Sequence, residues 1–116
     1  MTTRTIEISD ETWAKIKDQV EKDTQFKEIN KFEELVGEKV FIRTVTYHLT
    51  GKIKKITGNF FELEDAAWIA DSGRFMQCIK DGVLNEVEPI KTKWFVSIPS
   101  ITDFGIWKHE LPVDQK

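Results

Sequence analysis

The pattern of apolar and polar positions is clearest in the middle of the chain, where it predicts three consecutive β-strands. The first, Lys39–Tyr47, is apolar on both faces at its start, which is typical of a strand covered from two sides. The second, Leu49–Thr57, and the third, Phe60–Trp68, are separated by Gly58-Asn59. Glycine at the first position of a two-residue loop favours a type II′ hairpin turn. These residues are therefore expected to form the centre of an antiparallel sheet.

The second strand is expected to contain a β-bulge at Lys54-Lys55. In an unbroken hairpin Ile53 would face Glu64, and an apolar side chain would share a face with a carboxylate. One extra residue at Lys54-Lys55 removes this mismatch, bends the strand and helps a small sheet to close. Glu62 is then expected to be exposed on the opposite face. The predicted core face carries Ile53, Ile56, Phe61 and Leu63.

The first residues, 1–29, are predicted to form an appendage that ends in a polar linker. Arg4–Ile8 alternates as in a short strand, and Ser9 or Asp10 is placed to cap a helix that runs to about Lys22.

Residues 30–116 are predicted to form one domain, which begins with a short helix. Asn30 and Glu33 have the spacing of a capping box for a helix at Lys31–Val36. Gly37 supplies the left-handed residue that ends this helix.

A second helix and two more strands are predicted after the third strand. Asp71 or Ser72 is expected to cap a helix at Gly73–Lys80, which Gly82 ends. This helix lies in an insertion at about 71–82. The rest of the domain is predicted to be a loop, a strand, a tight turn and a last strand: Asn85–Lys93, Trp94–Ile98, Pro99-Ser100 and Ile101–Phe104.

The composition limits the binding partners and the cellular compartment that are expected for this chain. The chain has 116 residues, of which 40% are hydrophobic and 32% charged, as in an ordinary soluble domain. A net charge of −3 disfavours bulk electrostatic binding to nucleic acid or to an anionic membrane. The one cysteine, Cys78, excludes an intrachain disulfide and fits a reducing, cytoplasmic compartment. No apolar run approaches the ~20 residues of a membrane helix, so no membrane partner is expected.

The sequence does not indicate an enzyme, a metal site or a cofactor. Cys78, His48 and His109 are the nucleophile and base candidates beyond the serines, and no recognisable motif surrounds them. Neither a His/Cys/Asp spacing typical of metal ligands nor a glycine-rich phosphate loop is present.

Two clusters of polar and aromatic residues are candidates for a ligand site. One is rich in hydrogen-bond donors and ends the first strand. The other begins the inserted helix, where a Trp, an Arg and a helix N-terminus could stack a base and hold a phosphate. The alternative is a capped helix with an Asp71–Arg74 ion pair and a buried Trp, and cross-strand pairs likewise explain Lys52, Lys54 and Lys55. The candidate ligand-binding residues are Arg43, Thr46, Tyr47, His48, Trp68, Asp71 and Arg74.

Three motifs resemble those of the Sm-like (Hfq/LSm-type) small β-barrels. Leu35-x-Gly37-x-Lys39-Val40 is similar to the junction between the helix and the first strand of that family. Gly51-Lys-Ile with Asn59-Phe-Phe-Glu-Leu63 is similar to its first motif, and Val96-x-Ile98-Pro-Ser-Ile101 to its second. The resemblance implies a mainly β, α+β fold. Its centre would be a five-stranded, strongly bent antiparallel barrel, Sm-like or SH3-like, with N-terminal helices and an inserted helix.

The chain also departs from the family. Thr57 stands where an aspartate is usual, and Val96-Ser97-Ile98-Pro99 stands where RNA-binding members have Arg-Gly or Tyr-Lys-His. Lys108-His109 comes too late to replace that motif, and Asp71–Thr92 is an insertion. The uridine-reading residues of the family therefore cannot be carried over to this chain. It resembles a diverged bacterial or phage-encoded relative.

The resemblance implies a non-enzymatic binding protein that holds RNA or a nucleotide-like ligand. It also implies a homo-oligomer assembled through the open edges of the last two strands. The alternative is a protein-interaction or scaffold module without a nucleic-acid ligand, and the acidic charge balance favours this alternative.

Overall fold

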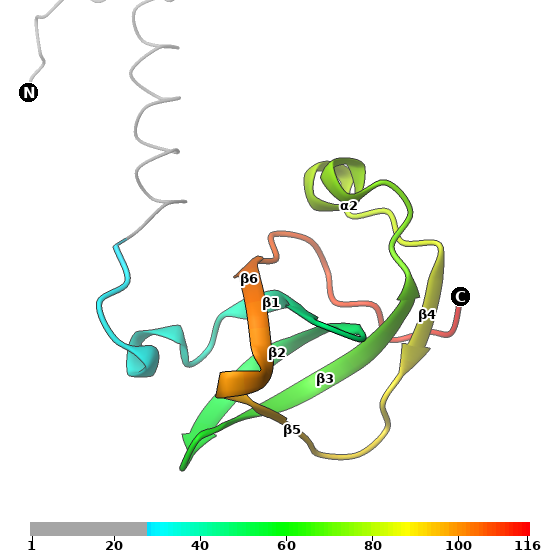
Figure 1. Cartoon of the computed structure of the whole chain (residues 1–116). Coiled ribbons are helices and arrows are strands. Elements are labelled where there is room, and N and C mark those ends of the chain that lie inside the picture. Colours follow the sequence, from blue (N-terminus) through cyan, green and yellow to red (C-terminus); the bar gives the residue numbers. More distant parts are fainter. Residues whose placement is uncertain (1–27) are drawn as a thin grey trace, which may run out of the picture. The chain divides into compact units, whose positions relative to one another are not determined.

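The computed structural model describes residues 28–116 of the chain (Figure 1). Among them, Lys31–Lys116 forms one compact unit. The strand and helix predicted for residues 4–22 lie outside the described residues. No helix within 28–116 is long and apolar enough to cross a membrane.

The described part is mainly antiparallel β-sheet with one α-helix, which agrees with the predicted β-rich α+β class. The helical elements are η1 (Phe32–Leu35), α2 (Phe75–Asp81) and η2 (Ile98–Ser100), of which η1 and η2 are 3₁₀ helices. The strands are β1 (Lys39–Thr44), β2 (His48–Thr57), β3 (Phe60–Asp71), β4 (Glu86–Pro89), β5 (Trp94–Ser97) and β6 (Ile101–Ile106).

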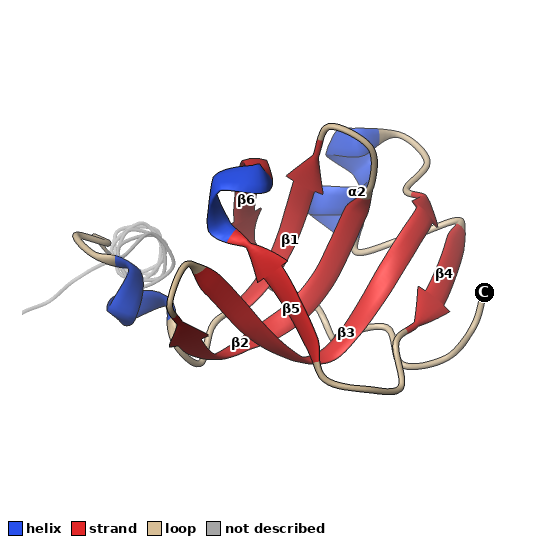
Figure 2. Ribbon diagram, turned by 60° about the horizontal axis from the view of Figure 1, so that its bottom comes forward, coloured by secondary structure: helices blue, strands red, loops and turns tan. Residues whose placement is uncertain are grey.

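The strands form a single curled sheet in the order β4-β3-β2-β1-β6, and β5 adds to β3 beside β4. β5 pairs with the beginning of β3, at Phe60–Leu63, and β4 pairs with its end, from Ala67 to Asp71. The turn η2 then leads the chain from β5 to β6, which pairs with β1 at the other edge. Figure 2 shows β5 crossing the sheet on its way to that edge.

The predicted bulge in β2 is confirmed. Ile53 pairs with Leu63 and Lys55 pairs with Glu62, so Lys54 is the extra residue. The turn before β3 also agrees with the prediction, since Gly58 has φ = 59° at the first turn position.

A second bulge, which the sequence analysis does not predict, lies in β3 at Asp65. Thr50 pairs with Ala67 but Lys52 pairs with Glu64, so β3 has one more residue than β2 in this interval. Asp65 has φ = 53°, in the left-handed region that few residues other than glycine adopt. Opposite it, Gly51 allows close approach, because a Cβ there would lie 3.3 Å from the Leu63 side chain.

Apolar side chains are buried on both faces of the sheet. On one face, the core contains Leu35, Val40, Ile42, Leu49, Ile53, Phe61, Leu63, Ala66 and Val96. On the other face, a second core contains Phe41, Ala67, Ile69, Cys78, Leu84, Val87 and Trp107, of which α2 contributes Cys78 and the C-terminal segment contributes Trp107. The two bulges decide which side chains belong to which core.

Three local predictions are wrong. Glu86–Pro89 is a strand rather than part of the predicted loop Asn85–Lys93, because it pairs with the end of β3, which extends past Trp68. No side chain caps α2; its N-cap is Arg74, and Asp71 instead accepts a hydrogen bond from the Gly73 N–H at 2.8 Å.

The first short helix is a 3₁₀ turn shifted by one residue from the predicted capping box. Lys31, not Asn30, is its N-cap, and the Lys31 N–H donates to Glu34 Oε2 at 2.9 Å.

The largest error concerns Glu62, which is 2% exposed rather than on the surface. Strands flank it on both sides, through Lys55 on β2 and Phe95 on β5. The lysine side chains of Lys54 and Lys55 reach back over it.

Candidate ligand-binding cleft

An aromatic cleft lies on the face of the sheet that carries the first core. Leu49 on β2 pairs with Trp68 on β3, which pairs in turn with Glu88 on β4, so these side chains form one row. Trp94 on β5 pairs with the core residue Leu63 and therefore points to the same face. The cavity measures about 340 Å³, and its lining residues are Tyr47, Leu49, Trp68, Glu88, Pro89, Ile90 and Trp94.

The aromatic rings of the cleft keep a large part of their surface in contact with solvent. Tyr47 is 36% exposed, Trp68 47% and Trp94 40%, whereas Leu49 beneath them is 2% exposed. Large apolar rings gathered around a hollow are typical of recognition sites, because the free protein gains little from leaving them in water. The cleft is therefore the best candidate for a ligand site among the described residues.

Local hydrogen bonds hold Tyr47 in place at the mouth of the cleft. The tight turn between β1 and β2 is closed by the Thr44 N–H, which donates to the Tyr47 carbonyl oxygen at 2.9 Å. The Thr44 hydroxyl oxygen accepts from the Tyr47 N–H at 3.1 Å. The backbone of Tyr47 is thus fixed to β1 rather than being part of a loose loop.

The second bulge brings Trp68 to the cleft. Without the extra residue at Asp65, the strand period of two would place Trp68 on the face opposite to Leu63. With it, Leu63, Ala66 and Trp68 share one face, and Ala67 belongs to the other core.

Glu88 is the only charged residue that lines the cleft in the described part of the chain. Its Oε1 accepts a hydrogen bond from Gln115 Nε2 at 3.4 Å, and this partner is neutral. The cleft therefore combines three aromatic faces with one carboxylate at its rim.

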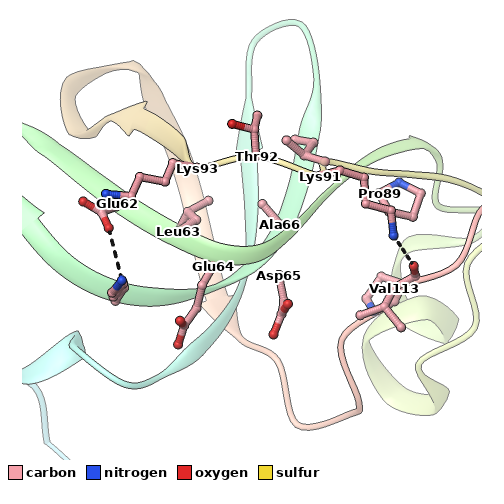
Figure 3. A pocket seen from close by; sticks show the side chains of 13 residues that line it. Glu62, Leu63, Glu64, Asp65, Ala66, Pro89, Lys91, Thr92, Lys93 and Val113 are labelled. Atoms are coloured by element: carbon pink, nitrogen blue, oxygen red, sulfur yellow. Dashed lines mark hydrogen bonds and ion pairs between the residues drawn. The ribbon is translucent and has the colours of Figure 1, made fainter.

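A second cavity, of about 440 Å³, shares Pro89 and Ile90 with the cleft (Figure 3). Charged residues form much of its lining. Glu62 lies 3.9 Å from the amino groups of both Lys54 and Lys55. Lys91 donates to the Val113 carbonyl oxygen at 3.1 Å. Because Glu62 already lies beside two lysines, the cross-strand interpretation of these lysines is supported, and fewer charges of this cavity are left to bind a ligand.

Arg43 and His48, two of the predicted site residues, lie away from the cleft. Arg43 Nε donates to Asp103 Oδ1 at 2.7 Å, a second nitrogen reaches Oδ2, and the guanidinium lies 4.3 Å from the centre of the Phe75 ring. The hydrogen bonds from Arg43 lower the pKa of Asp103, and the nearby His48 adds to this effect. The same pair raises the pKa of Arg43.

The other predicted site residues divide between the cleft and the loops. Tyr47 and Trp68 come together in the cleft although the sequence analysis assigned them to separate clusters. Asp71 holds a loop, through Gly73 and through its carbonyl oxygen, which accepts from the Asn85 N–H at 2.9 Å. The remaining two, Thr46 and Arg74, are exposed and do not line the cleft.

The sequence analysis missed Glu88 and Trp94. Trp94 was predicted to begin a strand, but only the pairing of β5 with β3 brings it beside Trp68. Glu88 lay in a predicted loop, so its position opposite Trp68 had no signal in the sequence pattern.

The described residues contain no group of three or more His, Cys, Asp or Glu side chains that could hold a metal ion. Cys78 is buried, and burial raises the pKa of its thiol, which keeps it protonated and poorly reactive.

Comparison with known proteins gives no match among protein-family models, curated proteins or solved structures. The geometry of the cleft is therefore the basis on which a function is inferred.

Proposed function

We propose that the protein is a non-enzymatic protein-interaction module, built as a small barrel of the Sm-like or SH3-like kind, whose aromatic cleft binds a polypeptide segment. The barrel architecture is supported by the order of β1, β2 and β3, by two bulges that bend them, and by the return of β6 to β1.

The observation that carries this proposal is the convergence of Tyr47, Trp68 and Trp94 on one largely apolar cavity. Aromatic side chains supply large contact areas at low entropic cost, and they are enriched in the energetically dominant parts of protein interfaces. The cleft opens on one face of the sheet, so an extended segment can place one side chain in it while its backbone lies outside.

RNA or a nucleotide-like ligand is the second candidate. It is favoured by the three aromatic faces, on which bases could stack, and by the Sm-like motifs. However, a phosphate needs cations, and Arg43 is already paired with Asp103. Because the charged group of the cleft is the carboxylate of Glu88, a polyanion is expected to bind there less tightly than a polypeptide does.

Self-association is proposed to occur through β5 and β6. Both strands carry large apolar residues that are exposed in the single chain: Phe95 44%, Phe104 36% and Ile106 40%. Exposed apolar strand edges favour pairing with another copy, which would also multiply the clefts available to one ligand. A mass measurement by light scattering tests this proposal, and a strictly monomeric protein at high concentration would contradict it.

A peptide-display selection against the full chain tests the main proposal. Enriched peptides are synthesised and titrated against the wild type, Trp94→Ala and Phe95→Ala. These two neighbouring residues have similar exposure but opposite directions on β5, since Trp94 faces the cleft and Phe95 pairs with Glu62. We expect Trp94→Ala to weaken binding at least about tenfold and Phe95→Ala to retain it, because a short peptide that fills one cleft does not depend on self-association.

The proposal fails if no peptide is enriched or if both variants, shown to be folded, bind equally well. A single-stranded RNA of mixed sequence, titrated from about 50 mM salt upward, tests the second candidate. RNA binding that is lost in Trp94→Ala and weakens steeply with salt would favour that candidate over the first.

A further inference from the structure

We propose that the group held in the aromatic cleft is an organic cation, the side chain of an arginine or of an N-methylated lysine in the bound polypeptide. This inference rests on the proposed function, because it names the chemistry of the segment that the cleft recognises.

Trp68 pairs with Glu88 in the wall of the cleft. They are direct cross-strand neighbours on β3 and β4, so an indole ring and a carboxylate stand side by side on one face. A cation placed there would meet the electron-rich face of the ring and a negative charge at once. Tryptophan is the strongest of the aromatic residues in such cation–π contacts. Tyr47 and Trp94 offer further rings around the same cavity.

The charge of the cleft comes from Glu88. No lysine or arginine within 28–116 forms an ion pair with Glu88, and its hydrogen-bond partner Gln115 is neutral. Two of the three carboxylates that line the neighbouring cavity differ in this respect, because Glu62 and Glu64 have lysine partners. Charge complementarity at the cleft therefore favours a cation.

The same chain already holds a cation between an aromatic ring and a carboxylate. On the opposite face, the guanidinium of Arg43 lies 4.3 Å from the Phe75 ring centre while it binds the Asp103 carboxylate. That arrangement joins a cation, an aromatic face and a carboxylate within one molecule. In the cleft, this chain supplies the aromatic faces and the carboxylate, and the ligand would supply the cation.

The cleft is large enough to hold a single side chain of the size of arginine. Its volume of about 340 Å³ lies near the lower end of the range for ligand pockets, roughly 300–1,000 Å³. Arginine and methylated lysine are expected to bind in the cleft more tightly than an unmodified lysine. Their charge is spread out and more weakly hydrated, so the free-energy cost of desolvation is lower.

The test uses four blocked glycine-rich pentapeptides that differ in the central residue: arginine, trimethyllysine, citrulline or lysine. Citrulline has nearly the shape of arginine without its charge. Each peptide is titrated against the full chain by calorimetry or by the change in tryptophan fluorescence. We expect the arginine or the trimethyllysine peptide to bind about tenfold more tightly than the citrulline peptide. Which of the two binds better identifies the source of the cation.

Two variants separate a local role of Glu88 from a general effect of charge. Glu88→Gln should weaken binding of the cationic peptide about fivefold to tenfold and leave the citrulline peptide unchanged. Glu86→Gln removes the same charge from the same strand, but Glu86 pairs with Asp71 and does not line the cleft. It should leave all four affinities unchanged. Trp68→Ala should abolish the preference for the cation, and Trp68→Phe should restore part of it.

The inference is overturned if the citrulline peptide binds as well as both the arginine and the trimethyllysine peptides, or if Glu86→Gln weakens binding as much as Glu88→Gln. It is also overturned if RNA binds in the cleft and Glu88→Gln strengthens that binding. If the displayed library yields peptides that depend on Trp94 but contain no preferred cation, the proposed function stands and only this inference fails.

Discussion

Trp68 lies on the same face of β3 as Leu63, although in an unbroken strand residues at an odd separation would point to opposite faces. The extra residue at Asp65 produces this relationship. It also divides the strand into two parts, so that residues before the bulge pair with β5 and residues after it pair with β4. Because of this one extra residue, β3 contributes side chains both to the first core and to the aromatic cleft.

Asp65→Gly is expected to stabilise the protein by about 0.5–1 kcal/mol, because glycine adopts the φ of 53° without the steric cost that Asp65 bears. Glu64→Gly is the matched control. It lies at the neighbouring position, where φ is not positive, and should instead lose about 0.5–1 kcal/mol. Urea unfolding of both variants measures the difference, and the same sign for both would contradict a strained bulge.

The alternation of the sequence was enough to predict the meander and the first bulge, because without an extra residue the apolar Ile53 would share a face with the carboxylate of Glu64. The second bulge had no such signal. Ala66 and Ala67 are small enough for either face, so the pattern around Asp65 fits a strand with or without the extra residue.

The cleft was only half predictable for a related reason. Tyr47 and Trp68 stood out as aromatic residues next to polar clusters, but their meeting depends on the pairing of His48 with Ile69 and of Leu49 with Trp68. Glu88 comes from a strand of four residues, which is too short for a periodic pattern to be recognised.

Deletion of Lys54 is expected to destabilise the protein by roughly 3 kcal/mol or more, because the side chains on one side of the bulge would change face. Lys54→Ala keeps the backbone and should cost less than about 1 kcal/mol, since the amino group is exposed and lies 3.9 Å from Glu62. Denaturation midpoints of the two variants test this contrast. Equal, small losses would show that the register tolerates the missing residue.

Glu62→Ala is expected to destabilise the protein by about 1–3 kcal/mol, although its place between Phe61 and Leu63 in the sequence suggested a surface residue. The side chain is 3% exposed, and its loss would leave two lysines without their partner and a space beneath them. Glu64→Ala removes the carboxylate of a pair that is 45% exposed on both sides, and should stay within about 0.5 kcal/mol. If Glu62→Ala and Glu64→Ala have the same free energy of unfolding, the burial of Glu62 does not contribute to stability.

Asp103 is expected to make stability depend on pH in the acid range. Its pKa is lowered in the folded protein, mainly by the hydrogen bonds from Arg43, so the folded state binds the proton less readily than the unfolded state. The contribution to stability is therefore fully present above the unfolded pKa of about 3.9 and is lost as the pH falls through the folded value. The Asp103→Asn variant should be less stable than the wild type near neutral pH, and the difference should shrink as the pH falls below 4.

A double-mutant cycle shows whether Arg43 causes this dependence. Arg43→Met keeps an unbranched side chain over the Phe75 ring but removes the donors that bind Asp103. If the pair acts as a unit, Asp103→Asn should cost much less in the Arg43→Met background than in the wild type, and the pH dependence should largely disappear. Urea midpoints measured for the four proteins at two pH values, one near neutral and one below 4, give the coupling. An undiminished pH dependence in Arg43→Met would assign the lowered pKa of Asp103 to another group, of which His48 is the nearest alternative.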